Sequence, residues 1–93
     1  MKLVYTDGAI EDLKRLSEFI VVHTPSAAAR VAAELVGKIE LLPNFPEMGA
    51  PVAMAPAPDS VRDMILGKYV VRYSVHPSAI IVLRVWYELE GER

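Results

Sequence analysis

The chain has 93 residues, of which 53% are hydrophobic and 24% charged, and this composition predicts one folded domain spanning residues 1–93. It has no cysteine and a formal net charge of −2, which argues against a disulfide framework, a thiolate metal site and broad electrostatic capture of nucleic acid. No apolar run is long enough for a signal peptide or a membrane span, so we expect a soluble, cytoplasmic protein. The apolar excess in so short a chain indicates a surface that a partner protein covers.

The first half of the chain predicts a strand followed by two helices. Residues 2–6 are β-branched and aromatic at their centre, as in a strand. A helix is expected from Gly8 to His23 with Asp7 as its cap, and Thr24-Pro25 should start a second helix. Because the link is short, the two helices should pack as an antiparallel hairpin. The expected buried stripes are Ile10, Leu13, Leu16 or Ser17 and Ile20, then Ala28, Val31 or Ala32, Leu35, Ile39 and Leu42.

A proline-rich segment separates the helices from the rest of the chain. Five of the seven prolines lie between Leu42 and Asp59. Proline lacks the N–H that a helix or an inner strand needs, so the segment should be a long loop. We expect this loop to be mobile near residues 54–58.

The last third of the chain predicts a three-stranded antiparallel meander. Val61–Leu66, Tyr69–Val75 and Ala79–Trp86 are rich in β-branched and aromatic residues. Gly67-Lys68 and His76-Pro77-Ser78 are suited to the two turns. Alternation assigns Tyr69, Val71, Tyr73, Val75, Ile81, Leu83 and Val85 to the core face, and Val70, Arg72, Ser74, Arg84 and Trp86 to the opposite face.

Short sequence motifs along this α+β pattern resemble those of the ParE/RelE superfamily, the toxin half of bacterial type II toxin–antitoxin pairs. The motifs are Ala9-x-x-Asp12-Leu13, Leu42-Pro43-x-x-Pro46-x-x-Gly49, Val61-Arg62, Tyr69-Val70-Val71-Arg72-Tyr73 and Ile81-Val82-Leu83-Arg84-Val85. The resemblance implies a RelE/ParE-like fold: an N-terminal strand, a two-helix antiparallel hairpin and the meander. It also implies a cognate antitoxin and a toxin–antitoxin hetero-oligomer.

The cations of the sequence favour a ParE-like toxin, which binds and inhibits DNA gyrase, over a RelE-like one, which cuts messenger RNA on the ribosome. A metal-independent endoribonuclease needs cationic side chains that converge on a phosphate. The RelE-like pattern has arginine after the first tyrosine of the middle strand, but here Val70 follows Tyr69. After Trp86 the chain carries three acids and one base, which would repel a phosphate.

Two alternatives stay open. The protein could be a RelE-like ribonuclease in which Arg62, Arg72, Arg84 and Tyr87 serve, or a non-toxic module that only binds an antitoxin. The acidic end of the chain supports the second alternative.

Five residues are candidates for partner binding, and none is assigned a catalytic role. Arg62, Arg72 and Arg84 fall one per strand and could form a basic strip, or could be ordinary solvated cations, with Arg62 more structural. Trp86 is either an exposed anchor for a partner or is covered by the proline-rich loop, and Tyr87 is a weaker candidate. We expect no cofactor and no metal, since the two histidines lack the spacing of a metal pair.

Overall fold

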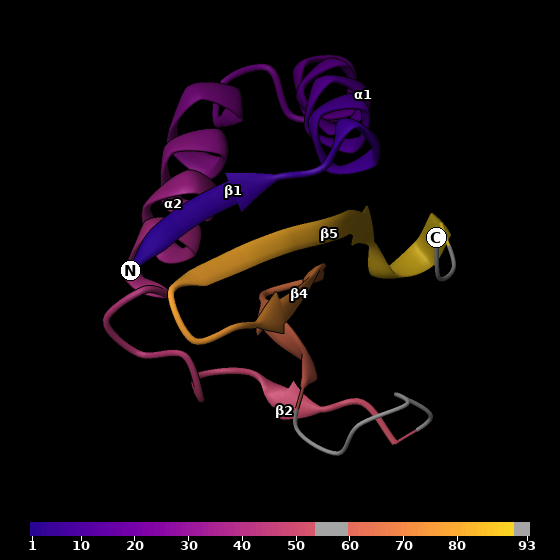
Figure 1. The fold of residues 1–93 in the computed structure, drawn as a ribbon. Coiled ribbons are helices and arrows are strands. Elements are labelled where there is room, and N and C mark those ends of the chain that lie inside the picture. The colour runs from indigo at the N-terminus through magenta and orange to yellow at the C-terminus, as the bar shows by residue number, and fades with distance from the viewer. Residues whose placement is uncertain (54–59, 91–93) are drawn as a thin grey trace.

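The computed structural model describes residues 1–53 and 60–90, which form an α+β fold (Figure 1). The expected mobility near residues 54–58 falls outside the described residues. The elements in chain order are β1 (Lys2–Tyr5), α1 (Asp7–His23), α2 (Ala28–Leu41), β2 (Ala50–Pro51), β3 (Val61–Leu66), β4 (Tyr69–Val75), β5 (Ala79–Tyr87) and a short 3-10 helix, η1 (Glu88–Glu90).

The strands form one mixed five-stranded sheet in the order β1-β5-β4-β3-β2. Strands β3, β4 and β5 pair antiparallel, which confirms the predicted meander, and β1 joins β5 in parallel. The proline-rich segment is not loop throughout, because Ala50 and Pro51 pair with Asp63 and Arg62 of β3. This strand lies at the sheet edge, where a missing N–H is tolerated.

Turn chemistry fixes the meander as expected. Gly67 has φ of 58°, a left-handed conformation that a side chain would strain, and so suits the first position of the two-residue turn. The second turn closes with a 2.9 Å bond from the His76 N–H to the Ala79 carbonyl.

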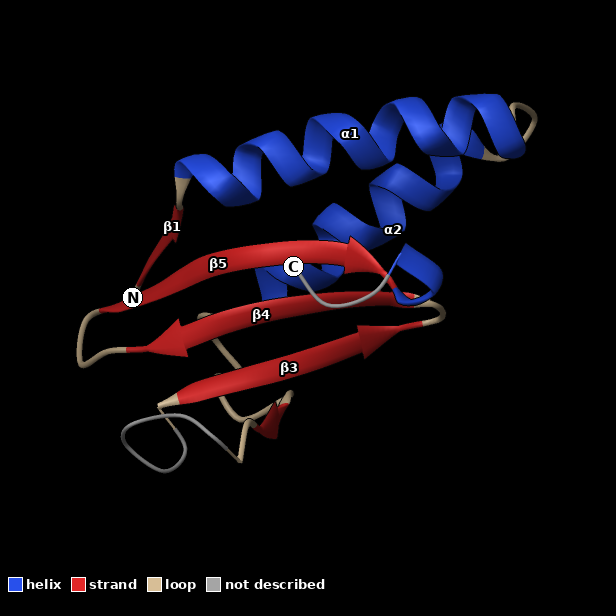
Figure 2. Cartoon of the chain, turned by 90° about the vertical axis from the view of Figure 1, so that its right-hand side faces the viewer, coloured by secondary structure: helices blue, strands red, loops and turns tan. Residues whose placement is uncertain are grey.

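Both helix starts differ from the sequence prediction. Thr6, not Asp7, caps α1, since its hydroxyl accepts a 3.0 Å bond from the Ala9 N–H. Helix α2 begins at Ala28 rather than at Thr24, because the Thr24 N–H bonds to the Ile20 carbonyl at 2.7 Å and so ends α1. The chain then turns, and α2 runs back at a slant toward the sheet (Figure 2).

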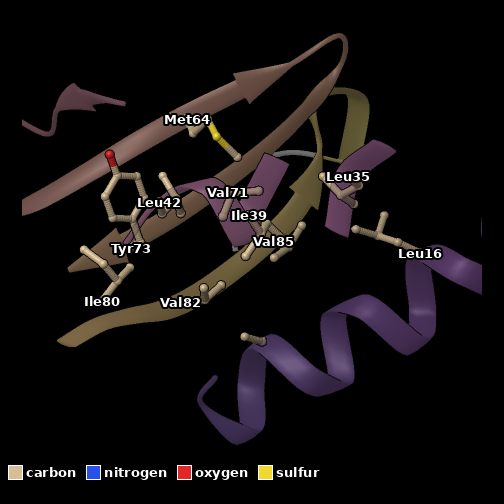
Figure 3. Packing of buried hydrophobic residues seen from close by; sticks show 11 residues of the cluster. Leu16, Leu35, Ile39, Leu42, Met64, Val71, Tyr73, Ile80, Val82 and Val85 are labelled. Carbon is tan, nitrogen blue, oxygen red and sulfur yellow. The ribbon is translucent and has the colours of Figure 1, made fainter. Parts of the chain in front are cut away.

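The core lies between the helices and one face of the sheet (Figure 3). The second half of the stripe expected for α2 is confirmed, since Leu35, Ile39 and Leu42 are buried in the core with residues of β4 and β5, whereas Ala28, Val31 and Ala32 are only partly buried. In α1 the buried set is Ala9, Asp12, Leu16 and Ile20, whereas Ile10 is 42% exposed. Helix α1 is rotated from the expected position because polar side chains on it bond to β5, as described below.

A bulge in β5 makes part of its face assignment wrong. Arg72 pairs with Arg84 but the next residue, Tyr73, pairs with Val82, so Leu83 is an extra residue. The core residues of β5 are therefore Ile80, Val82 and Val85 rather than Ile81, Leu83 and Val85. The assignment of β4 is confirmed, with Val71 and Tyr73 fully buried and Tyr69 and Val75 packed against them.

Within residues 1–53 and 60–90, neither helix has the length and apolar character that crossing a lipid bilayer requires.

Candidate partner-binding site

Arg72 and Arg84 lie directly opposite each other on the sheet face turned away from the core, as predicted. Arg72 makes a forked pair with Asp63 of β3, through Nε at 2.8 Å and Nη2 at 3.0 Å. Its guanidinium also lies over the Trp86 ring, 5.1 Å from the centroid. Arg72 is therefore engaged by a carboxylate and an aromatic face.

Arg84 is held by Asp12 of α1. Its Nε and Nη2 donate to the two oxygens of Asp12 at 2.7 and 2.9 Å, and Arg15 donates to the same carboxylate at 2.7 Å. The Asp12 carboxylate is buried, at 1% exposure, and also accepts the Val85 N–H at 2.9 Å. Burial by itself would raise the pKa of Asp12, but the bonds from Arg84, the Val85 N–H and Arg15 outweigh it and lower that pKa below the usual range.

These contacts close the edge of β5 where β1 has ended. The Thr6 hydroxyl donates to the Leu83 carbonyl at 2.8 Å, and Asp12 accepts the Val85 N–H. Arg15 donates to the Val85 carbonyl at 3.3 Å. Side chains of α1 and of its N-cap therefore take the hydrogen-bonding positions of a neighbouring strand. This explains why the Ala9-x-x-Asp12-Leu13 motif lies in the first turns of α1.

The acidic end of the chain takes part in the same arrangement. Glu90 accepts two bonds from Arg15, at 3.0 and 3.1 Å, and the Tyr87 N–H at 2.8 Å. Arg15 therefore balances the charge of Glu90, one of the acids expected to repel a phosphate. Hydrogen bonds, first to Glu90 and then to Asp12, raise the pKa of Arg15.

Arg62 lies on the opposite side of the sheet, because it pairs with the core residue Tyr73. It donates to the Gly49 carbonyl at 2.6 Å and more weakly to that of Glu47 at 3.4 Å. The structural role expected for Arg62 near the loop is thus supported. The three arginines do not form one basic strip, since the sheet separates Arg62 from the other two.

Trp86 and Tyr87 take opposite faces of β5. Trp86 is 5% exposed, so it is not an exposed anchor, and the guanidinium of Arg72 covers part of its ring. Tyr87 is half-buried in a row of rings, 5.3 Å from Tyr69 and 5.2 Å from Phe19 by centroids. Neither position tests whether a partner contacts these residues.

A shallow apolar hollow lies along the exposed side of α1. It measures about 600 Å³ and continues into two neighbouring hollows through shared residues. We call the three together the α1 groove. Its lining comprises Tyr5, Ile10, Leu13, Lys14, Leu16, Ser17, Glu18, Ile20, Val21, Val22, Ala32, Leu35 and Val36.

Ile10 is the exposed groove residue that the sequence assigned to the core. The signal that could have placed it is Ala9, because a core-facing Ala9 turns Ile10 outward by 100° on a helix. Within the described residues, no three His, Cys, Asp or Glu side chains cluster as a metal site would need.

The chain resembles known proteins over nearly its whole length. Residues 3–90 match the family described as "ParE toxin of type II toxin-antitoxin system, parDE". Over 82 residues the chain is 32% identical to the protein named Toxin RelE1 from Caulobacter vibrioides, which covers 88% of this chain and 87% of that protein.

Two solved structures share the fold. One is titled "Chromosomal ParDE TA system from P. aeruginosa" and matches with a TM-score of 0.76 at 24% identity, covering 94% of this chain and 95% of that chain. The other is a conserved hypothetical protein from Helicobacter pylori, with a TM-score of 0.56 at 21% identity and 96% of each chain covered.

Proposed function

Since this chain belongs to the ParE toxin family of type II toxin–antitoxin systems, we propose that it arrests bacterial growth by binding DNA gyrase and that a cognate antitoxin neutralises it. The resemblance in sequence is confirmed at the level of the family. The choice of gyrase as the target rests on the state of the cations on the sheet.

The arginines that a ribonuclease would use are engaged by the protein itself. Arg72 is forked to Asp63, and Arg84 is forked to the buried Asp12. Each carboxylate neutralises charge that a phosphate would need, and separating Arg84 from Asp12 is costly because the Asp12 side chain is buried. This observation supports a toxin that acts through protein contacts more than one that cleaves RNA.

The α1 groove is the surface that we assign to the antitoxin. Its floor is apolar and its edges carry Lys14 and Glu18, which suits the mixed chemistry of an amphipathic peptide. Groove residues such as Ile10, Val21 and Val22 are exposed, although they are large and hydrophobic. Covering them by a segment of antitoxin would produce the toxin–antitoxin hetero-oligomer that the family implies.

The second candidate is a RelE-like, ribosome-dependent ribonuclease. One observation favours it, namely the 32% identity with a protein that bears the name Toxin RelE1. In that case Arg72 and Arg84 would bind phosphate through N–H groups outside their forks, or would leave their carboxylates on the ribosome. A module that binds an antitoxin without any toxicity is the third possibility.

One experiment separates the three functions. The chain is induced in a bacterial host, alone and together with its cognate antitoxin, while growth and messenger RNA ends are followed. Purified chain is added to a gyrase supercoiling assay. The control variant Leu16→Glu places a charge in the core, where Leu16 is 1% exposed, and should abolish every effect of the folded protein.

Growth arrest with loss of supercoiling and unchanged RNA ends is the expected result. New codon-aligned RNA ends together with normal gyrase supercoiling would indicate that the target is the ribosome and not gyrase. Unimpaired growth, with the antitoxin still bound, would leave the non-toxic antitoxin-binding module as the remaining function. Ile10→Ser should weaken binding of the neutralising protein, because it removes apolar area from the groove.

A further inference from the structure

The loop between α2 and β2 presents two large apolar side chains to solvent. Phe45 is 58% exposed and Met48 is 39% exposed. They border a second hollow of about 640 Å³, which we call the Phe45 surface. It is lined by Asn44, Phe45, Pro46, Glu47, Met48 and Val75.

Buried polar groups hold this loop in place from below. The Tyr73 hydroxyl donates to the Pro46 carbonyl at 2.7 Å and accepts the Gly49 N–H at 2.8 Å. Tyr73 is fully buried, and burial raises its pKa, so the hydroxyl keeps the proton that it donates. Arg62 donates to the Gly49 carbonyl at 2.6 Å.

Backbone bonds fix the two apolar residues themselves. The Phe45 N–H donates to the Leu41 carbonyl at 3.0 Å and to the Leu42 carbonyl at 3.1 Å, and the Met48 N–H donates to the Phe45 carbonyl at 3.0 Å. The loop therefore needs little ordering when a partner binds. A preordered apolar residue loses less conformational entropy in a complex, which is a property of binding hot spots.

The Phe45 surface is separate from the α1 groove. The two share no lining residue among those described. Figures 1 and 2 both show α1 at one end of the molecule and the segment leading to β2 at the other. A partner in the groove thus leaves the Phe45 surface open unless it extends across the sheet.

We propose that this toxin binds its protein target through the Phe45 surface, and that the antitoxin binds at a separate surface, the α1 groove. The inference rests on the proposed toxin function. Among the described residues that line this hollow, Glu47 alone is charged, so the surface would repel a nucleic acid phosphate. It fits a protein patch that offers an apolar side chain beside a cation.

The test replaces Phe45 and Met48 together by serine, in the variant Phe45→Ser with Met48→Ser. Thermal unfolding and copurification with the antitoxin report on the fold, and both should stay near the wild type because the side chains are exposed. Growth arrest should be lost and the concentration for half-inhibition of gyrase supercoiling should rise at least about tenfold. The matched control is Ile65→Ser, an exposed apolar residue on β3 outside both hollows, which should arrest growth like the wild type.

Each outcome decides one question. If the wild type arrests growth and the double variant does so equally, the Phe45 surface is not the target site. If the double variant and the Ile65→Ser control lose arrest together, the loss is not specific to this surface and the proposal also fails. A wild-type chain without any toxicity refutes the proposed function itself. This result is distinct from the first two outcomes, because in both of them the wild type arrests growth.

Discussion

Replacing Asp12 by alanine tests the charge network that joins α1 to β5. The change removes a buried carboxylate that accepts bonds from Arg15, Arg84 and the Val85 N–H. The Val85 N–H lies at the edge of β5 beneath α1, and Val85 is fully buried, so the lost acceptor is not replaced by solvent. An unsatisfied buried donor of this kind costs about 1–3 kcal/mol.

The two arginines add less than the buried N–H. Their side chains are 33% and 39% exposed, so water can solvate them once Asp12 is gone. Each lost pairing should then cost less than the unsatisfied N–H does. The N–H therefore dominates the loss, at about 2 kcal/mol, which corresponds to a fall in Tm of roughly 10 °C for a chain of this size.

Denaturant unfolding of Asp12→Ala, Asp12→Asn and a control measures this cost. Asparagine keeps an oxygen for the Val85 N–H, so we expect about half the loss of alanine. The control is Glu11→Ala, whose exposed side chain makes only a 3.8 Å pair with Lys14 and should change stability by less than about 0.5 kcal/mol. Equal stability of Asp12→Ala and Glu11→Ala would refute the role of Asp12.

The same network gives a pH dependence with a definite sign. The pKa of Asp12 is lower in the folded protein than its usual value, so the unfolded chain takes up this proton first as the pH falls. The contribution of Asp12 is therefore complete at neutral pH and is lost progressively below about pH 5. Asp12→Asn should lose less stability than the wild type between pH 7 and pH 3, and a parallel loss would contradict this account.

Three further predictions concern the loop and the end of the chain. Gly49→Ala should destabilise by about 2 kcal/mol in urea melts, since its Cβ would lie 2.8 Å from the backbone of β3. The matched Gly37→Ala lies in the interior of α2, where the described residues place no atom outside the local helix backbone within 4 Å of its Cβ, and it should stabilise by about 0.5–1 kcal/mol; the opposite order would be decisive against this packing. Tyr73→Phe removes the hydroxyl between two loop backbone groups and should cost about 1–3 kcal/mol, with faster hydrogen exchange at the Gly49 N–H as the specific readout. Glu90→Ala should remove one of the two carboxylates that bind Arg15 and speed exchange of the Tyr87 N–H, and unchanged exchange would show that Glu90 does not hold this end of the chain.

Local chemistry explains which parts of the fold the sequence predicts well. The meander follows from β-branched runs and from turns such as Gly67-Lys68, whose glycine has the conformation that the turn needs. The inner face of β4 follows from the alternation of large apolar residues with Arg72 and Ser74. Both signals lie within a few neighbouring residues.

The bulge in β5 has no comparable signal. From Ala79 to Leu83 every residue is apolar, so alternation gives no register, and the extra residue at Leu83 becomes visible only through pairing with β4. The faces of Ile81 and Leu83 were therefore assigned wrongly. Val85 was assigned correctly because Arg84 and Trp86, on either side of it, mark the opposite face of the strand after the bulge.

The candidate residues depend on contacts far apart in the chain. Asp12 meets Arg84 and Val85 across more than 70 residues, so the sequence could mark the motif around Asp12 but not its partner. For the same reason the sequence could not show that Arg84 is paired, whereas the partner of Arg72 is Asp63, on the neighbouring strand. Hydrogen bonding between distant segments is what the pattern of a single chain leaves out.

The closed edge of β5 also bears on self-association. An open strand edge presents unpaired N–H and C=O groups and is a template on which another chain can add, as in aggregates and amyloid. Here the side chains of Thr6 and Asp12 bond to the backbone groups of that edge, so the edge stays covered only while α1 is folded. Any change that loosens the first turns of α1 should therefore uncover the edge of β5 beyond its pairing with β1 and convert a local loss of helix into aggregation.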